Sequence, residues 1–217
     1  MAAIFVDVDG TLVQFDRSFA EIFADACDRV GLAVGDEHQR YYTERFFGHF
    51  GAFADDPYLS ASRDLCEAYE LDVTPQTFHD ARLAAEYDAT VVADGVREAL
   101  GVLSDDHRLG VLSNGVGDVQ REKLRRHDLL ECFETVVVSH DVGAMKPDAR
   151  IFAEAEDRLP ADRHVYVGDS ADHDVGGAVD AGWNAAVHVV ADEADCSDCH
   201  ARAHVTPDEF DRLATLV

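Results

Sequence analysis

Four short segments, far apart in the chain, carry residue types that are suited to phosphoryl transfer. They are residues 7–11 (Asp-Val-Asp-Gly-Thr), 113–115 (Ser-Asn-Gly), 146–148 (Lys-Pro-Asp) and 168–170 (Gly-Asp-Ser), the last followed by Asp174. Carboxylates can act as nucleophile, acid, base or metal ligand, whereas hydroxyl, amide and ammonium groups can stabilise a phosphoryl group. One such segment would be a weak signal. Four in this order, in compatible contexts, predict one site for phosphate chemistry.

Asp7 and Asp9 lie two residues apart after an apolar run, and in a regular strand this spacing places both side chains on one face. Two carboxylates so close repel each other, and the pKa of one rises unless a cation lies between them. The pair suits a nucleophile and a general acid/base beside Mg²⁺, which takes one or two carboxylates plus substrate and water oxygens. Asp169 and Asp174 offer further oxygens for the same ion.

The second and third segments supply hydrogen-bond donors and positive charge. Ser113 and Asn114 provide a hydroxyl and amide hydrogens, which phosphoryl oxygens require as substrate-binding donors. Lys146 provides a fixed charge that stabilises the transferring group. It is one of only two lysines, with Lys123, in a chain that otherwise uses arginine. Because lysine is a compact point charge and arginine a planar fork, its retention favours a function.

The elements that position these segments can be predicted from the hydrophobic pattern. Residues 3–8, 108–113 and 164–168 are predicted strands, so three of the four segments follow a buried strand. Helices predicted at 94–103, 118–127, 149–158 and 172–181 alternate with strands that also include 135–139, 185–190 and 203–205. This alternation predicts an α/β fold with a doubly wound, Rossmann-like parallel sheet. Ligands of such folds bind at the carboxyl ends of the strands.

Residues 15–90 interrupt this alternation with a run of predicted helices and no convincing strand. The helices are expected at about 19–31, 37–50, 57–70 and 75–89, the last begun by the N-cap Thr74 and by Pro75. We therefore predict a core domain of residues 1–14 and 91–217 and a small α-helical cap domain of residues 15–90. Six aromatic residues between 41 and 53 form either the core of the cap or a surface for substrate or a second copy.

The ordered motifs resemble those of the haloacid dehalogenase (HAD) superfamily, in the branch with a helical cap after the first motif. The resemblance spans about residues 3–190, although the cap matches only in position and helical character. It implies that Asp7 attacks phosphorus to form an aspartyl-phosphate, while Asp9 protonates the leaving oxygen and then activates water. It also implies that Asp7, the main-chain carbonyl of Asp9 and Asp169 bind Mg²⁺, supported by Asp174. Ser113 and Lys146 match the second and third motifs, and the strands ending at Asp7, Ser113 and Asp169 are expected side by side.

The expected function is a Mg²⁺-dependent phosphatase that acts on a small phosphorylated metabolite. A phosphomutase of the same superfamily is the main alternative, because it uses the same four motifs. A catalytically inactive, HAD-like binding protein is a second alternative, which the intact set of acids and Lys146 disfavours. The aspartate at position 9 argues against the metal-free dehalogenases of the superfamily. The absence of lysine between residues 15 and 90 argues against members that form a Schiff base in the cap.

Charge is the extreme property of the composition, because 44 acidic residues against 18 basic ones give a net charge of −26. The acids are spread along the chain, and the lysine-poor, evenly acidic pattern resembles that of proteins from salt-accumulating, halophilic cytoplasm. Self-repulsion at this charge is tolerable where the Debye length falls to about 3 Å, near 1 M salt. No basic stripe is present, so nucleic acid is not an expected partner.

The remaining expectations concern location and assembly. No apolar stretch approaches the roughly 20 residues of a membrane span, and the N-terminus runs directly into a predicted strand, so we expect no membrane contact and a cytoplasmic location. The chain is expected to be a monomer or a homodimer. Its five cysteines are an odd number, which disfavours a disulfide framework. Cys196 and Cys199, with His200 and His204, have a spacing that could bind zinc but is more simply a hydrophilic loop.

Overall fold

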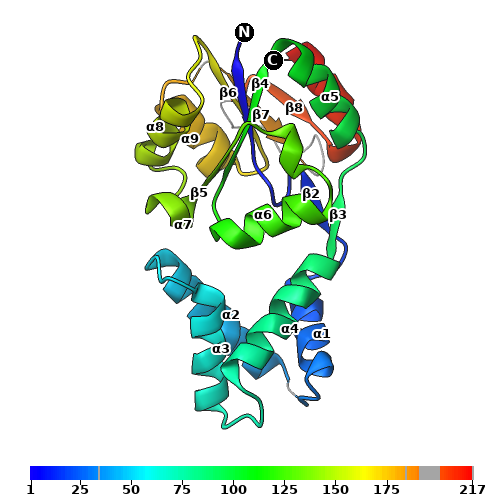
Figure 1. The fold of residues 1–217 in the computed structure, drawn as a ribbon, viewed down its shortest axis with the longest axis vertical. Helices are drawn as coiled ribbons and strands as arrows, with labels where there is room; N and C mark the ends of the chain where they lie inside the picture. The colour runs from blue at the N-terminus through cyan, green and yellow to red at the C-terminus, as the bar shows by residue number, and fades with distance from the viewer. Residues whose placement is uncertain (34, 184, 191–200, 217) are drawn as a thin grey trace. The chain divides into compact units, whose positions relative to one another are not determined.

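The computed structural model of the protein describes residues 1–33, 35–183, 185–190 and 201–216. The chain forms two compact units (Figure 1). The first contains Met1–Gln14 and Val91–Val217, and the second contains Phe15–Thr90.

The first unit is built on a six-stranded sheet in the order β5-β4-β1-β6-β7-β8. All neighbouring strands in it are parallel. The strands are β1 (Ala3–Val6), β4 (Arg108–Ser113), β5 (Thr135–Val138), β6 (His164–Gly168), β7 (Ala185–Val189) and β8 (Ala203–Val205). The α-helices are α5 (Val96–Asp106), α6 (Gly117–Arg126), α7 (Ser139–Val142), α8 (Ala149–Arg158), α9 (Gly177–Asp180) and α10 (Leu213–Leu216). The other helical segments are η1 (Leu130–Cys132), η2 (Ala171–Gly176) and η4 (Pro207–Arg212).

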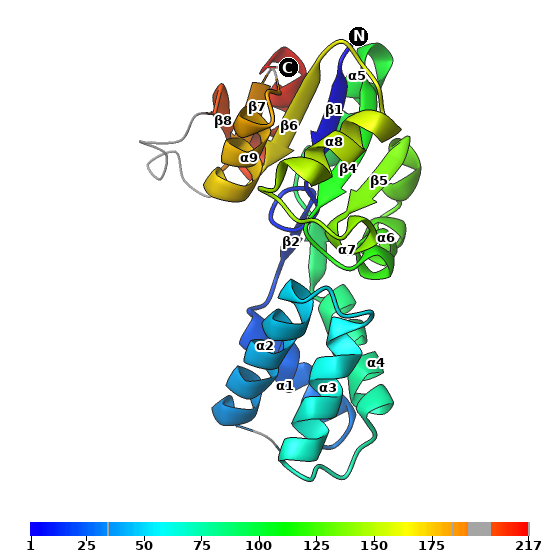
Figure 2. The same ribbon diagram turned by 90° about the vertical axis from the view of Figure 1, so that its left-hand side faces the viewer.

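Helices cover both faces of this sheet (Figures 1 and 2). Strand β1 is buried throughout, and successive residues enter different cores, as expected for a central parallel strand. Ile4 belongs to a cluster with residues of α5 and α10, whereas Phe5 belongs to a second cluster with residues of α8 and α9. The predicted doubly wound, Rossmann-like parallel fold is therefore confirmed.

The register of the central strands brings their carboxyl ends to one edge. Val6 of β1 pairs with Val111 of β4 and with Val167 of β6. The residues that follow these positions therefore leave the sheet at nearly the same level. The strand order also reverses around β1, which is the switch point where ligands of open α/β sheets bind.

The second unit is formed by α1 (Phe19–Arg29), α2 (Asp36–Gly51), α3 (Pro57–Ala68) and α4 (Pro75–Asp88). Side chains cap three of these helices: Ser18 caps α1 in a capping box, Asp56 caps α3 and Thr74 caps α4. Their apolar faces enclose a core of the unit's own, which contains Tyr42 and Phe78 and against which Phe46 packs. Phe47, in contrast, is 62% exposed.

Several elements differ from the sequence-based expectation. Two short strands, β2 (Val13–Phe15) and β3 (Thr90–Val92), form a separate two-stranded sheet where no strand was expected. Strands of three residues are too short to show the alternation of apolar and polar residues by which a strand is recognised in a sequence. Strand β1 ends at Val6 rather than at residue 8. The helix expected at 172–181 consists of the π-helical segment η2 followed by α9.

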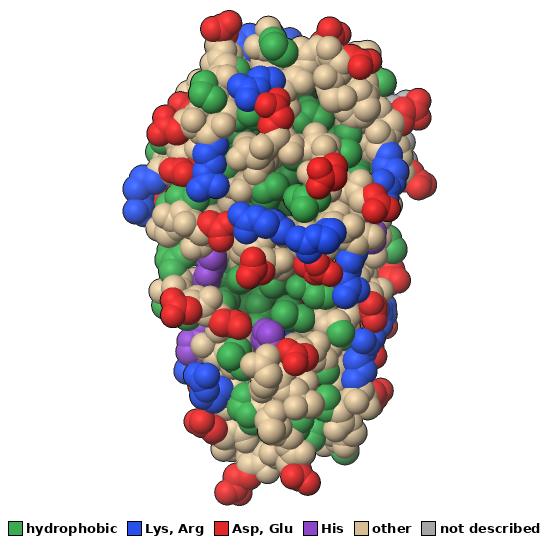
Figure 3. Space-filling view, viewed as in Figure 1, with side chains coloured by type: hydrophobic (Ala, Val, Ile, Leu, Met, Phe, Trp, Pro, Cys, Tyr) green, Lys and Arg blue, Asp and Glu red, His purple; other side chains and the backbone are tan. Residues whose placement is uncertain are grey.

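The charge pattern is visible on the surface of the protein. Acidic side chains are spread over the face seen in Figure 3, among fewer basic ones, and do not collect in one patch. In the described part of the chain, none of the helices combines the length and the apolar character that a bilayer crossing requires. The cysteines at 27, 66 and 132 are free.

Candidate active site

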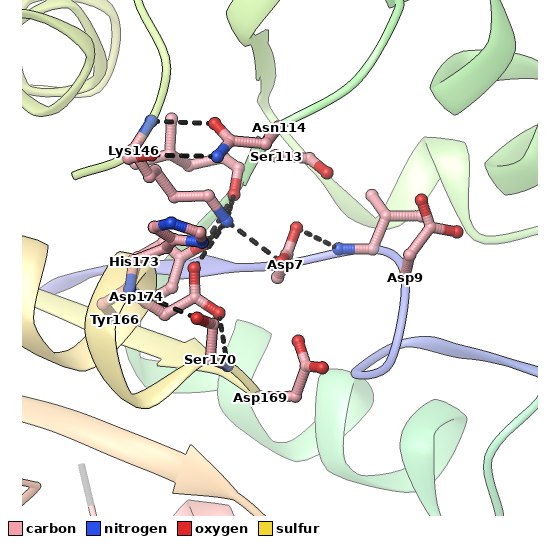
Figure 4. A network of polar contacts seen from close by, with 12 residues as sticks. Asp7, Asp9, Ser113, Asn114, Lys146, Tyr166, Asp169, Ser170, His173 and Asp174 are labelled. Carbon is pink, nitrogen blue, oxygen red and sulfur yellow. Dashed lines mark hydrogen bonds and ion pairs between the residues drawn. The ribbon is translucent and has the colours of Figure 1, made fainter. Parts of the chain in front are cut away.

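The carboxyl edge of the sheet gathers the motif residues into one cluster (Figure 4). Asp7 directly follows β1, Ser113 ends β4 and Asp169 directly follows β6. These three strands are neighbours, in the order β4-β1-β6, as the family resemblance implied. Residues separated by more than a hundred positions in sequence therefore meet because parallel strands end together.

Lys146 is buried at the centre of this cluster, with its side chain 1% exposed. Its ammonium nitrogen has four oxygen neighbours: Asp174 Oδ1 at 2.7 Å, Asp7 Oδ2 at 2.9 Å, Tyr166 Oη at 2.6 Å and the main-chain oxygen of Leu112 at 3.3 Å. Burial lowers the pKa of an ammonium group, but the carboxylates of Asp7 and Asp174 outweigh this effect and raise the pKa of Lys146. The lysine is therefore a fixed positive charge.

Asp7, Asp169 and Asp174 form a group of carboxylates in which one oxygen of each lies within 4.8 Å of the others. Burial raises the pKa of Asp7 to about 7; the Lys146 ammonium opposes this rise, and the carboxylates of Asp174 and Asp169 add to it. Burial and the nearby Asp174 also raise the pKa of Asp169. Burial is the larger cause of both shifts, and the repulsion between carboxylates held close together adds to it. The arrangement suits a bound cation.

The π-helical segment η2 folds Asp174 back into the cluster. The main-chain N–H groups of Asp174 and Val175 both donate to the carbonyl of Ser170, at 3.0 and 3.2 Å. The Asp174 side chain, 1% exposed, in turn accepts a 2.9 Å hydrogen bond from the Ser170 main chain. A Cβ atom on Gly168 would lie 2.3 Å from Asp174 Oδ2, so the motif's glycine makes room for this carboxylate. Short π-helical segments are frequent at functional sites.

Asn114 holds the backbone of Lys146 in place. Its side-chain amide donates to the Lys146 carbonyl at 3.0 Å, and its side-chain oxygen accepts from the Lys146 N–H at 2.8 Å. The side chain thus links the second motif to the third. Its polar atoms are both engaged in this way, so the observed contacts make it a support for Lys146, and a part in substrate binding stays a prediction.

Asp9 lies on the turn after β1, and its carboxyl group faces α6. Lys123 Nζ is 2.8 Å from Asp9 Oδ1, and Gln120 Nε2 is 2.8 Å from Asp9 Oδ2. Strand β1 ends at Val6, before both Asp7 and Asp9, so the spacing rule for a regular strand does not apply to this pair. The carboxylate of Asp9 is not part of the acidic group found in the described residues. The metal contact implied for Asp9 involves its main-chain carbonyl, and it stays a prediction.

Sequence reasoning missed three polar residues of this region: Gln120, Lys123 and Tyr166. Lys123 had a signal, since it is one of two lysines, and both prove to be 2% exposed at this site. Gln120 lies three residues before it on the same helix. No sequence signal indicated Tyr166, because a tyrosine within an apolar strand is typical of a buried core residue.

Zinc binding by the cysteines near the C-terminus stays a prediction. Cys196, Cys199 and His200 lie outside the described residues. His204 is in β8, where its ring centre is 5.8 Å from that of His188. His188 contacts the Asp169 carbonyl through Nε2 at 2.8 Å.

Comparisons with known proteins identify the family of the chain. The family model for haloacid dehalogenase-like hydrolases matches residues 1–182. Glyceraldehyde 3-phosphate phosphatase of Methanothermobacter thermautotrophicus is 44% identical over 195 residues, covering 85% of this chain and 84% of that protein. Pyrimidine 5'-nucleotidase YjjG of Escherichia coli is 26% identical over 184 residues, 82% of each chain. The structure of a HAD phosphatase from Thermococcus onnurineus shares the fold, with a TM-score of 0.69, 23% identity, and coverage of 100% of this chain and 99% of that one. The chain therefore belongs to the haloacid dehalogenase-like hydrolases.

Proposed function

We propose that this protein is a Mg²⁺-dependent phosphatase that hydrolyses a small phosphorylated metabolite through an aspartyl-phosphate on Asp7. The observation that carries the proposal is the buried contact of Lys146 with Asp7 and Asp174, beside Asp169. A nucleophile, a fixed positive charge and a set of cation ligands thus occupy one edge of the sheet. The similarity to a phosphatase over most of both chains supports the same function.

The residues present fit Mg²⁺. The ion prefers oxygen ligands and binds through one or two carboxylates together with substrate oxygens and waters. Three ionised carboxylates against one ammonium group would leave an excess of two negative charges, which a divalent ion would neutralise. We assign Asp7, Asp169 and the main-chain carbonyl of Asp9 as ligands, with Asp174 in support. When bound, the ion would neutralise charge on the phosphoryl oxygens.

The first half of the reaction forms the aspartyl-phosphate. A carboxylate oxygen of Asp7 attacks phosphorus, and the bond from phosphorus to the ester oxygen breaks. The leaving oxygen takes a proton from the carboxyl group of Asp9. Lys146 and the Ser113 hydroxyl stabilise the negative charge on the phosphoryl group as it is transferred.

The second half releases phosphate. Asp9, now a carboxylate, accepts a proton from water while the water oxygen attacks phosphorus. The bond between phosphorus and Asp7 then breaks, which restores Asp7 as a carboxylate and Asp9 as an acid. One residue can serve in both directions because its two roles alternate within each cycle.

Glyceraldehyde 3-phosphate is the substrate that we propose to test first, because the relative that is 44% identical is named as a phosphatase of this compound. It is an alkyl phosphate monoester, so its leaving group is an alkoxide that needs a proton. The proposed role of Asp9 meets that need. The prediction that residues 15–90 act as a cap remains part of this proposal.

The test is phosphate release from glyceraldehyde 3-phosphate and from p-nitrophenyl phosphate, with Mg²⁺ or with EDTA, in wild type and Asp7→Asn. We expect hydrolysis that requires the metal and is lost in the variant. Equal rates in wild type and Asp7→Asn would contradict the proposed mechanism. No hydrolysis by the wild type would favour the inactive binding protein. A hexose 1-phosphate that is isomerised without release of phosphate would instead indicate the phosphomutase.

A further inference from the structure

Two side chains of one helix hold the Asp9 carboxyl group between them. Lys123 Nζ contacts Oδ1 and Gln120 Nε2 contacts Oδ2, each at 2.8 Å. Both belong to α6, and their spacing of three places them on one face of the helix. We propose that Gln120 and Lys123 are positioning residues that aim the Asp9 carboxyl group at the leaving oxygen, an inference that rests on the proposed phosphatase function.

Gln120 joins Asp9 to Ser113. Its Nε2 also donates to Ser113 Oγ, at 2.9 Å. The ionised form of Asp9, which Asp9 has after it has given up its proton, only accepts hydrogen bonds, and the NH₂ of the Gln120 amide is the group that faces it. Both hydrogens of that NH₂ are then used. The Ser113 oxygen accepts one of them, and the Ser113 hydroxyl can donate its own proton to the Asp7 carboxylate, whose pKa this hydrogen bond lowers.

The burial of these residues indicates a role beyond stability. Gln120 is 1% exposed and Lys123 is 2% exposed, whereas the side chain of Asp9 is 34% exposed. Burying an ammonium group costs free energy, and a carboxylate that is one-third exposed offsets less of that cost than a buried carboxylate would, even at 2.8 Å. Gln120 Oε1 is buried without a hydrogen-bond partner in the described structure, which destabilises the fold further. The amide contributes through its NH₂ group, and this group is directed at Asp9 and Ser113.

The second motif is shaped to admit Gln120. A Cβ atom on Gly115 would lie 2.7 Å from Gln120 Cγ and 2.8 Å from its Nε2. Any larger residue at position 115 would therefore displace the amide. The close approach of α6 to the end of β4 therefore explains why the third residue of the Ser-Asn-Gly segment is a glycine.

Loss of this positioning has a specific kinetic signature. A general acid must lie within about 2.6–3.2 Å of the atom that it protonates. An Asp9 released from α6 can rotate toward solvent, so protonation of the leaving group slows. An alkoxide leaving group requires this proton, whereas p-nitrophenolate is stable enough to leave without it. The defect should therefore depend on the leaving group, which a loss of stability alone would not produce.

The experiment compares kcat/KM for glycerol 1-phosphate and p-nitrophenyl phosphate in wild type, Lys123→Met and Gln120→Glu. This ratio covers the steps up to departure of the leaving group. Methionine keeps the length of lysine without charge, and Gln120→Glu keeps the shape while placing a second carboxylate against Asp9. In both variants, we expect kcat/KM for glycerol 1-phosphate to fall more than kcat/KM for p-nitrophenyl phosphate. The two losses should differ by roughly 10-fold or more, which is within the range of general-acid effects. Asp9→Asn should show the same selectivity.

Arg125→Met is the matched control, because Arg125 is exposed on the same helix and pairs with Glu122. It should leave both substrates unaffected. Thermal unfolding with and without Mg²⁺ gives a readout besides activity: the shift in Tm caused by Mg²⁺ should persist in Lys123→Met, because the Asp9 carboxylate is outside the acidic group. Equal losses for both substrates, or no loss for either, would overturn the inference. A wild type without Asp7-dependent hydrolysis would overturn the proposed function itself.

Discussion

Lys146 Nζ lies 2.9 Å from Asp7 Oδ2, and both side chains are buried. The same ammonium group also contacts Asp174, so a single lysine compensates two buried carboxylates. Removing one partner of a buried ion pair leaves an uncompensated charge, which destabilises the fold more than replacing both partners by apolar residues would. This contact therefore makes Lys146 important both for stability and for the proposed chemistry.

We expect Lys146→Met to lower kcat by about 10²-fold or more, because a charge that stabilises the transition state is lost. It should also lower the free energy of unfolding by about 3–5 kcal/mol, the usual cost of breaking a buried ion pair. Activity and urea unfolding measure the two effects. Arg150→Met removes an exposed cation that pairs with Asp148 and should change neither property. A fully active Lys146→Met protein would contradict the assigned role.

Binding of Mg²⁺ should compete with protons at Asp7. The pKa of Asp7 in the metal-free fold is raised to about 7, from 3.8. Between these two values the native state binds more protons than the unfolded state, so the stability of the metal-free protein should fall as the pH rises through this window. Mg²⁺ favours the carboxylate, and its binding should therefore tighten over the same window and release protons.

Titration calorimetry with Mg²⁺ at pH 5.5 and pH 8, in buffers of different ionisation enthalpy, measures this coupling. We expect weaker binding and measurable proton release at the lower pH. Asp7→Asn should lose both the affinity and the dependence on pH. Binding that does not change between the two pH values would show that Asp7 is not a ligand.

The order of elements and the location of the site could be predicted from the sequence. Apolar runs that end in polar motifs are local signals, and the parallel register then brings Asp7, Ser113 and Asp169 together. The direction of each side chain could not be predicted. Strand β1 ends at Val6 rather than at residue 8, and the Asp9 carboxyl group contacts Gln120 and Lys123 of α6, which no local pattern indicated.

Contacts between residues that are far apart in the chain could not be predicted from the sequence either. From its motif, Asn114 was predicted to bind substrate, but its side chain binds the backbone of Lys146, which is 32 residues away. Gln120 contacts Asp9 from 111 positions along the chain. Such partners are set by the packing of α6 and of the loop before α8, and no local pattern encodes this packing.

Gly10 should be required for the metal site. It has a φ of +80°, and a Cβ atom there would lie 2.3 Å from Asp169 Oδ2. Gly10→Ala should therefore displace the Asp169 carboxylate, and we expect it to abolish the rise in Tm caused by Mg²⁺. Gly143→Ala is the matched control, because Gly143 has a φ of +73° and nothing within 4 Å of its Cβ position. Both variants should lose about 1–2 kcal/mol from backbone strain, but Gly143→Ala should keep its response to Mg²⁺.

The core of the helical unit contains a second buried ion pair. Arg82 Nη1 lies 2.9 Å from Glu86 Oε2, with both side chains less than 9% exposed, and the hydroxyl of Tyr58 donates to Glu86 at 3.1 Å. We expect Arg82→Met alone to lower the free energy of unfolding by about 3–5 kcal/mol, because Glu86 keeps its buried charge. Arg82→Met combined with Glu86→Gln should be less destabilised than that single variant. Urea unfolding of the four proteins of this cycle gives the coupling energy, and simple additivity would show that the pair is not coupled.

The net charge of −26 should make stability depend on salt. Raising KCl from 0.1 to 1 M shortens the Debye length from about 10 to 3 Å and screens the repulsion among acidic side chains. Exposed ion pairs such as Arg108–Glu134 weaken under the same conditions, but each contributes at most about 1 kcal/mol. We therefore expect Tm to rise with KCl, mostly below 1 M. A rise confined to higher concentrations would indicate a general salt effect on apolar surface, since screening is largely complete by then.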